Sequence, residues 1–433
     1  MFDNKEIQLT YGQNGHTLNT GQVFSKDNQW IVFDYRNHDG DIKITGSIGI
    51  VNLITGEEHI IYTTPNQTSF GPGVGAASFS PTENKVIFIH GIRNADERHP
   101  YDFTRRTGVA IDIEKPQVPV FMDARNIQKP FTLGALRGGT HAHSWSGDGQ
   151  MLSFTYNDDV IKELAKTNRK VKDLRTVGIM FPKEVIVSDT SNVENNSGQM
   201  FSVLAATVTE DPVAGSNEID MAFDECWIGI DGYLKPNGAR QRKALAFQGN
   251  VKDANGKIVT EIFVADIADD ITTASFDLDI AGTETARPSV PTQITQRRIT
   301  FTEKGVKGPR HWLRSSADGS QVFFLSEDEN GLVQVYSISP NGGVVKQVTQ
   351  HAFSVAGPIN ISPDGLYLSY LADQSVFVTE INKGISQRLT ERYAKPEHLT
   401  GAIVWSNDGC KLAFNRYVKS ESGTFLQIFL MLK

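Results

Sequence analysis

The sequence has few cysteines, no long apolar run and no excess of positive charge, and each shortage excludes a class of protein. Only two of the 433 residues are cysteines, Cys226 and Cys410, which is too few for a disulfide framework and shows no metal-ligand spacing. No run approaches the roughly 18 apolar residues that cross a bilayer, so we expect no membrane partner. The 42 Lys and Arg against 50 Asp and Glu leave a net charge of -8. A field of this sign repels nucleic acid and argues against it as a partner.

The remaining composition is that of a globular chain with many turns. Hydrophobic residues make up 39% of the sequence, beside 38 Gly and 17 Pro, and this excludes a disordered or fibrous protein. The first residues, MFDNKEIQLTYGQNG, contain no basic segment followed by an apolar core, so no secretory signal is recognisable there. We expect a cytoplasmic protein, or a periplasmic one if a leader has been removed.

Internal repetition is the strongest signal in the sequence. In six aligned copies a serine is followed six positions later by an aliphatic residue and eight positions later by an aromatic one. In the fullest copies Ser-x-Asp-Gly provides a side-chain oxygen for a turn and a glycine for positive φ, and the two apolar positions share one face of the next strand. The pattern predicts a strand, a turn and a second strand in each copy. The copies are FSKDNQWIVF from Phe24, FSPTENKVIF from Phe79, WSGDGQMLSF from Trp145, SSADGSQVFF from Ser315, ISPDGLYLSY from Ile361 and WSNDGCKLAF from Trp405.

A seventh, degenerate copy completes a ring. RKALAFQG keeps the two apolar positions at Leu245 and Phe247 but has lost the turn motif. The shortest intervals between copies match one four-stranded propeller blade. After the last copy too little chain remains for an outer strand, and the N-terminal KEIQLTY can supply it. The sequence therefore predicts an all-β, seven-bladed β-propeller whose N-terminal strand pairs into the last blade. We expect one domain over residues 1–433, with insertions near 160–232 and 268–300.

Several stretches resemble known families. The Ser-Pro-Asp-Gly blades are similar to TolB-type propeller repeats. Longer, non-repeat motifs resemble the bacterial YidR family of propellers, for which no activity is established. These motifs are IHGIRNADERHPYDFTRRTGV (Ile89 to Val109), LRGGTHAHSWSGDGQMLSFTYND (Leu136 to Asp158), GSNEIDMAFDECWIG (Gly215 to Gly229), GTET at Gly282, QRRITFT at Gln296 and GPRHWLR at Gly308.

A looser similarity is to the oligogalacturonate lyases, seven-bladed propellers with histidines just upstream of several turns. Those enzymes hold a divalent metal in the central funnel, and the resemblance implies a comparable site here. Nine of the ten histidines map to the blade face opposite the Ser turns, with His59 the exception. Neutral imidazole is a common ligand of Mn, Zn or Ni.

His141, His143 and His311 are the candidate metal ligands. His141 and His143 are expected to point the same way, because they are two positions apart on one strand. The alternative is that these histidines bind loop backbone or line a water-filled channel. Both interpretations stay open at this stage.

Arginines accompany these histidines and could bind an anion. A guanidinium holds a carboxylate or phosphate through two hydrogen bonds, and Arg137 and Arg314 are the candidate carboxylate clamps. Tyr156, where the second strand of its blade ends, is a candidate general acid or stacking platform, and otherwise an aromatic cap. Ordinary surface ion pairs would also explain the arginines. The full set is Arg93, Arg98, Arg105, Arg106, Arg137, Arg310 and Arg314.

Two further charged segments favour plain interpretations. KTNRKVKDLR, residues 166–175, reads as a solvated surface loop in preference to an anion-binding patch. GSNEIDMAFDECW contains Glu218, Asp220, Asp224 and Glu225, which could move protons but are expected to be solvated loop carboxylates.

Two functions follow from these patterns. The first is a propeller whose central funnel binds a small anionic ligand or a protein without performing chemistry. The second is a metal-assisted lyase that acts on uronate-containing oligosaccharides, with a metal and an arginine neutralising the substrate carboxylate while a histidine or tyrosine moves the proton. The fold favours neither function.

Overall fold

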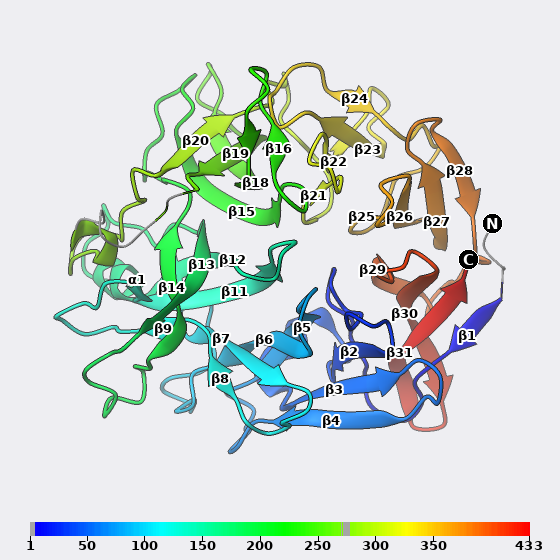
Figure 1. The fold of residues 1–433 in the computed structure, drawn as a ribbon, viewed down its shortest axis with the longest axis horizontal. Coiled ribbons are helices and arrows are strands. Elements are labelled where there is room, and N and C mark those ends of the chain that lie inside the picture. The colour runs from blue at the N-terminus through cyan, green and yellow to red at the C-terminus, as the bar shows by residue number, and fades with distance from the viewer. Residues whose placement is uncertain (1–4, 270, 272–277) are drawn as a thin grey trace.

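The computed structural model describes residues 5–269, 271 and 278–433 and has the predicted architecture. Seven small antiparallel sheets surround a central axis, and residues 6–8 and 423–432 belong to the same sheet (Figure 1). Within each sheet, the strands follow one another from the central axis to the outside of the ring. The sequence prediction of a seven-bladed propeller is therefore confirmed.

The blades follow the chain order. Blade 1 contains β2 (Trp30–Asp34), β3 (Ser47–Asn52) and β4 (Glu58–Thr63), and blade 2 contains β5 (Val74–Phe79), β6 (Lys85–Gly91), β7 (Arg106–Asp112) and β8 (Val120–Phe121). Blade 3 contains β11 (Gly138–Trp145), β12 (Leu152–Asp158), β13 (Thr176–Val185) and β14 (Gly198–Leu204). Blade 4 contains β15 (Ile219–Trp227), β18 (Lys243–Lys252), β19 (Ile258–Ile267) and β20 (Ile294–Arg298).

The last three blades are built in the same way. Blade 5 contains β21 (Arg314–Ser315), β22 (Val322–Glu327), β23 (Val333–Ile338) and β24 (Lys346–Gln347). Blade 6 contains β25 (Asn360–Ile361), β26 (Tyr367–Ala372), β27 (Ser375–Glu380) and β28 (Ile385–Arg388). Blade 7 contains β29 (Leu399–Trp405), β30 (Lys411–Ser420), β31 (Gly423–Leu432) and the N-terminal β1 (Glu6–Gln8).

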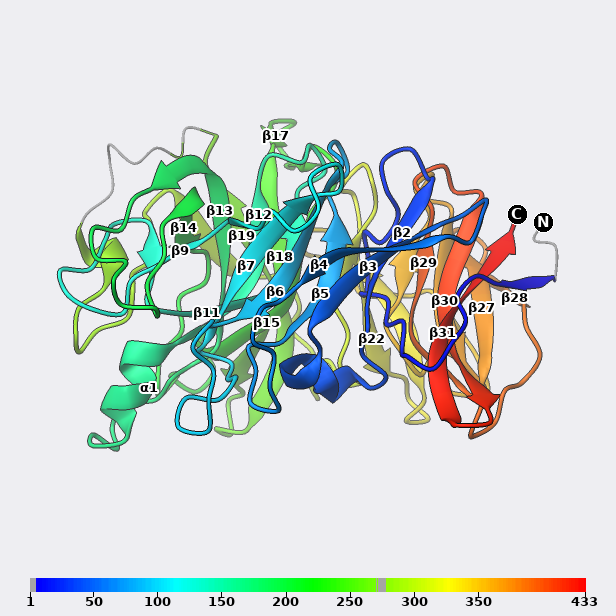
Figure 2. The same cartoon turned by 90° about the horizontal axis from the view of Figure 1, so that it is seen from below.

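Smaller elements decorate the ring. They are the parallel pair β9 (Ala124–Arg125) and β10 (Ala135–Leu136), the hairpin β16 (Tyr233–Leu234) and β17 (Arg240–Gln241), the helix α1 (Asp159–Ala165) and the 3-10 turns η1 (Asp39–Ile44) and η3 (Leu278–Ala281). In the side view α1 lies on one face of the ring and β17 on the other (Figure 2).

The Ser-x-Asp turns show why the repeat specifies a blade. In the sixth blade Ser362 Oγ donates to Asp364 Oδ1 at 2.5 Å and accepts from the backbone N–H of Tyr367 at 2.9 Å. The same two bonds recur at Ser25, Ser146, Ser316 and Ser406. Each turn thus satisfies its own backbone, and the strand that follows points its alternate side chains into the core.

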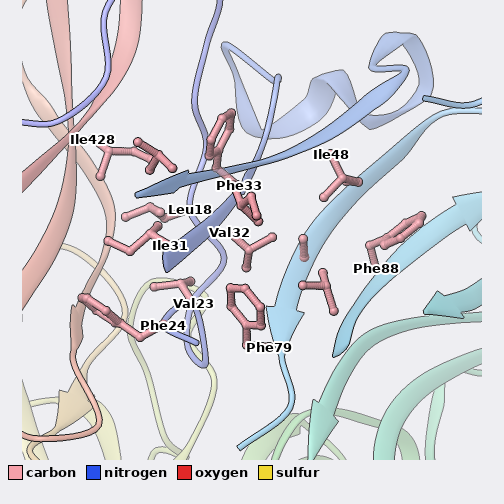
Figure 3. Packing of buried hydrophobic residues seen from close by; sticks show 14 of the residues in the cluster. Leu18, Val23, Phe24, Ile31, Val32, Phe33, Ile48, Phe79, Phe88 and Ile428 are labelled. Carbon is pink, nitrogen blue, oxygen red and sulfur yellow. The ribbon is translucent and has the colours of Figure 1, made fainter. Parts of the chain in front are cut away.

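The N-terminal strand closes the ring as predicted. Glu6 pairs with Met431 and Gln8 with Phe429 in antiparallel register, so neither end of the chain leaves the last sheet with a long open edge. Blade 1 packs between its two neighbours: its Ile31 and Phe33 lie between Ile428 of blade 7 and Phe79 of blade 2 (Figure 3).

The two regions expected as insertions contain regular blade strands. Residues 160–232 include β13, β14 and β15, and only α1 and the loops are extra. Residues 268–300 include η3 and β20, while residues 270 and 272–277 of that region lie outside the described residues. No helix among the described residues is long and apolar enough to cross a membrane.

Candidate functional site: a funnel with an arginine cluster

A cavity of about 830 Å³ lies on the propeller axis. It opens on the face that carries η1, since the exposed residues His38, Asp39 and Gly40 line it there. Ligand sites of propellers and barrels favour such mouths, and the volume is within the ~300–1,000 Å³ typical of small-molecule sites. Of the ten histidines, three line this funnel: His38, His141 and His398.

His141 reaches the funnel because β11 is bulged. The register of β11 with β12 shifts between His141 and Ser144, and Ala142 has a φ of 56°. His141 is 4% exposed, and neither of its ring nitrogens has a hydrogen-bond partner within the part of the chain that the structure describes. A buried polar group without a partner is costly, which makes this ring a candidate ligand-binding group.

Three arginines surround His141. Arg106 lies at the start of β7, Arg175 just before β13 and Arg310 before β21, and all three line the funnel. Burial, and after it the charges of these arginines, lower the pKa of His141 well below its usual value. His141 is therefore neutral at physiological pH, with an acceptor nitrogen beside three cations.

Two of these arginines are held only by neutral groups. Arg106 donates to Tyr101 Oη at 2.8 Å and to the carbonyl of Phe103 at 3.4 Å, while its buried Nη2 has no partner among the described residues. Arg175 donates to Asn157 Oδ1 at 3.3 Å. Both guanidiniums also lie against the ring of Phe103, 4.5 and 5.3 Å from its centre. Within residues 5–269, 271 and 278–433 neither has a carboxylate at ion-pair distance.

The third arginine is paired with a buried carboxylate. Arg310 donates through Nε and Nη2 to Asp224 Oδ1, both at 3.2 Å. Asp224 occupies a bulge of β15 with a φ of 52°, as Ala142 does in β11. The neighbouring Glu225 accepts from Thr155 Oγ1 at 3.0 Å, and burial raises its pKa to about 7. Of the three guanidiniums in the cluster, only that of Arg310 is at ion-pair distance from a carboxylate among the described residues.

The opposite wall of the funnel is aromatic and mostly uncharged. Tyr417 Oη donates to the carbonyl of Asn37 at 2.7 Å and lies 2.9 Å from His38 Nδ1, and the ring of His398 packs 4.8 Å from that of Tyr417. Arg36 is neutralised on this side by a bidentate pair with Asp34 at 2.6 and 2.9 Å. Lys395 also lines the funnel on this side, whereas three guanidiniums gather around His141.

The structure does not bring the three candidate metal ligands together. His143 Nε2 lies 3.0 Å from Thr140 Oγ1, and its ring packs against Gly108 of blade 2. It does not line the funnel, because the bulge at Ala142 interrupts the alternation that would have aimed it beside His141. His311 uses both ring nitrogens: Nδ1 lies 2.9 Å from the carbonyl of Pro309, and Nε2 accepts from the N–H of Leu325 at 2.9 Å.

The residues present do not fit a resident divalent metal. No group of three or more His, Cys, Asp or Glu side chains among the described residues is arranged to hold one. His141 is the one of the three predicted ligands that lines the funnel, and the adjacent arginines repel a cation. We therefore derive no chemistry through a metal.

The predicted clamps and the predicted acid have structural roles. Arg137 is fully buried, pairs with Asp158 at 2.6 Å and donates to the carbonyls of Thr283 and Ala286. Tyr156 Oη accepts from the N–H of Arg137 at 3.2 Å, and its ring belongs to the core between blades 2 and 3. Burial raises the pKa of Tyr156 well above its usual value.

Arg314 does not line the funnel. It donates to Asn360 Oδ1 at 2.6 Å, to the carbonyl of Leu313 at 2.9 Å and to that of Thr20 at 2.6 Å. It is a contact between blades 1, 5 and 6, and all of its acceptors belong to the protein.

Sequence reasoning missed Arg175 and misjudged the acidic pair. Arg175 is the last residue of the basic segment 166–175, where a solvated loop was expected, and it enters the funnel. Asp224 and Glu225 were expected in a solvated loop and are each 1% exposed in β15. In the structure Ala76, Ala142 and Asp224 each have positive φ three positions before the aromatic residue that ends the inner strand, but these three residues share no pattern that would predict a bulge from the sequence. Arg106 and Arg310 were in the predicted arginine set.

Comparison with known proteins supports the same fold. A family model described as "Protein of unknown function (DUF3748)" matches residues 73–196. The chain is 35% identical over 415 residues to "Uncharacterized protein YidR" of Escherichia coli (strain K12), covering 94% of each chain. Among solved structures, it is similar to an oligogalacturonate lyase in complex with manganese (11% identity, 99% of this chain and 92% of that chain, TM-score 0.55). It is also similar to a putative TolB from Agrobacterium tumefaciens (13% identity, 88% and 97%, TM-score 0.41).

Proposed function

The chain belongs to the YidR family, and we propose that its central funnel binds a small carboxylic acid at Arg106, Arg175 and His141. One observation carries the proposal: two guanidiniums without a carboxylate partner among the described residues lie beside a buried imidazole whose ring nitrogens are also unpartnered there. An acid with a carboxylate and an adjacent hydroxyl would provide hydrogen-bond partners for the guanidiniums and for the imidazole. The carboxylate can accept from two guanidiniums, and a hydroxyl next to it can donate to the neutral imidazole.

Sugar acids are the class of ligand that the funnel favours. The aromatic wall at Tyr417 and His398 provides a flat surface opposite the cations, and rings of this kind pack against the apolar face of a cyclic ligand. The likeness in fold to an oligogalacturonate lyase supports the choice of a uronate as the ligand class. The depth of Arg106 and His141, which are 3% and 4% exposed, favours a small molecule over a protein surface as the occupant.

The test is calorimetric titration with galacturonate, and with galactose as the uncharged control. Galactose differs only in having a hydroxymethyl group in place of the carboxylate. We expect galacturonate to bind and galactose not to bind. Affinity should fall with added salt, because the attraction is between charges.

Variants locate the binding site. Arg106→Gln or Arg175→Gln should each weaken galacturonate binding about 10- to 100-fold, since a hydrogen bond to a charged group contributes about 1.5–3 kcal/mol. Arg242→Gln is the matched control: it removes one charge from a side chain that is 61% exposed and pairs with Asp231 and Asp269 away from the funnel. Equal binding of galactose and galacturonate, or unchanged affinity in both funnel variants, would contradict the proposal.

A lyase is the second candidate, because a ring nitrogen of His141 without a partner among the described residues lies beside the arginines. The arginines would bind the substrate carboxylate and acidify the adjacent C–H. A ring nitrogen of His141 would take that proton, the C–H electron pair would form the new C=C bond, and the glycosidic oxygen would leave and take a proton from water. The ultraviolet absorbance of an unsaturated product from oligogalacturonate tests this activity. If the wild-type protein binds oligogalacturonate but forms no such product, the lyase activity is excluded and only the binding function remains.

A further inference from the structure

One end of the propeller channel is closed by a segment of blade 1. Residues 19–22, which precede β2, bond to four other blades. The carbonyl of Thr20 accepts from Arg314 of blade 5 at 2.6 Å and from Asn360 of blade 6 at 2.9 Å. The side chain of Gln22 accepts from the N–H of Trp145 in blade 3 at 3.0 Å and donates to its carbonyl at 2.9 Å. These bonds hold backbone across the centre, so it forms a floor.

Further bonds tie the same segment to blade 2. Asn19 Nδ2 donates to the carbonyl of Ala76 at 3.2 Å and to Ser78 Oγ at 2.7 Å, and the N–H of Phe79 donates to the carbonyl of Gln22 at 2.6 Å. Thr20 and Asn19 line the funnel from below. Among the described residues, these bonds cover one end of the funnel and leave its mouth on the face that carries η1.

The charged cluster lies well inside this closed funnel. Trp145, which is bonded to the floor, stands four positions after His141 on β11, so about 10 Å of strand separates His141 from the floor at about 3.3 Å per residue with one bulge. His141 and Arg106 are nearly inaccessible from the surface, whereas the side chain of Arg310 is 54% exposed towards the mouth. A ligand group that meets His141 must enter from the mouth and has no second exit.

We infer that the funnel recognises its acid by a chain end: it accepts a free small acid or the terminal acidic unit of an oligomer, and excludes internal units. This inference rests on the proposed function and adds to it the form of the substrate. An internal unit of a linear polymer has covalent neighbours on two sides, and both would have to leave through the single mouth. A terminal unit has one neighbour, which can extend past Arg310 to solvent.

The experiment compares uronate chains of different length on the wild-type protein. Galacturonate, digalacturonate, trigalacturonate and a long polygalacturonate are each titrated calorimetrically. We expect the binding curves to coincide when concentration is expressed as chain ends. Expressed as carboxylates, a polymer of about 100 units should then bind about 100-fold more weakly than the monomer. Arg106→Gln should weaken every member of the series by the same factor.

The outcomes separate this inference from the proposal beneath it. Curves that coincide when concentration is expressed as carboxylates, with Arg106→Gln still weakening them, would overturn end recognition and leave the binding site intact. A thermal unfolding assay gives a second test, in which the long polymer and the monomer are added at the same concentration of carboxylates. End recognition would be overturned if the polymer then raised the thermal midpoint as much as the monomer does. Failure of every member to bind, the monomer included, would overturn both.

Discussion

Glu225 gives the sharpest quantitative prediction, because it is a carboxyl group that the fold keeps out of water. It is 1% exposed, its Oε2 accepts from Thr155 Oγ1 at 3.0 Å, and its Oε1 has no hydrogen-bond partner among the described residues. Burial raises its pKa from 4.5 to about 7. Between these values the folded protein holds a proton that the unfolded chain has released.

The sign and size of the effect follow from proton linkage. Because the folded state binds more protons between pH 4.5 and 7, the free energy of unfolding falls as the pH rises through this window and stays lower above it. The full fall is about 3 kcal/mol, since one pKa unit corresponds to about 1.4 kcal/mol. Glu225→Gln keeps the acceptor for Thr155 but cannot ionise, so it should lose this fall.

The assay is urea unfolding of the wild type and of Glu225→Gln at pH 5 and pH 8. From pH 5 to pH 8, the free energy of unfolding of the variant should rise by about 2–3 kcal/mol relative to that of the wild type. The comparison is needed because burial lowers the pKa of His143 to about 3 and of His311 to about 4, and these groups increase stability as the pH rises. Glu184→Gln, the same change at an exposed position, should leave the pH dependence unchanged. Identical pH dependence in Glu225→Gln and the wild type would refute the argument.

Three further predictions test the floor, the blade turns and the metal fit. Gln22→Leu removes the side-chain partners of the backbone N–H and carbonyl of Trp145. It should lower the free energy of unfolding by about 2–4 kcal/mol in a denaturant titration. A loss below about 0.5 kcal/mol would show that these bonds do not hold the floor. Ser362→Ala removes the bonds to Asp364 and Tyr367 and should cost about 1–2 kcal/mol in the same assay, more than Ser422→Ala at an exposed site. Excess Mn²⁺ should not raise the thermal midpoint of unfolding, because the described residues contain no group of side chains arranged to bind a metal ion. A saturable rise in the midpoint would contradict that conclusion.

The fold could be predicted because its information is local. A Ser-x-Asp turn satisfies its own backbone within six residues, as Ser362 and Asp364 show, and the alternation of the next strand decides which side chains are buried. Ring closure could also be predicted from the sequence. The residues after the last repeat copy are too few for a fourth strand, and β1 provides that strand.

The site could be predicted only in part. The sequence placed His141 and several arginines on one face, and the structure brings His141, Arg106 and Arg310 to the funnel. It did not place His143, because strand periodicity assumes unbroken alternation and β11 is bulged at Ala142. It did not place Arg175, because a basic loop segment has the same composition whether it is solvated or reaches inward.

What the sequence alone determined is therefore the repeat: seven small sheets, the turns between their strands and the closure of the ring. Only the tertiary structure decided which side chains meet at the centre, because these side chains come from the bulges and loops of different blades and no local pattern records their separation in space. The floor made by residues 19–22 belongs to this second class as well. Its bonds to Trp145, Arg314 and Asn360 join residues that are between 123 and 340 positions apart in the chain, and they exist only once the ring has closed.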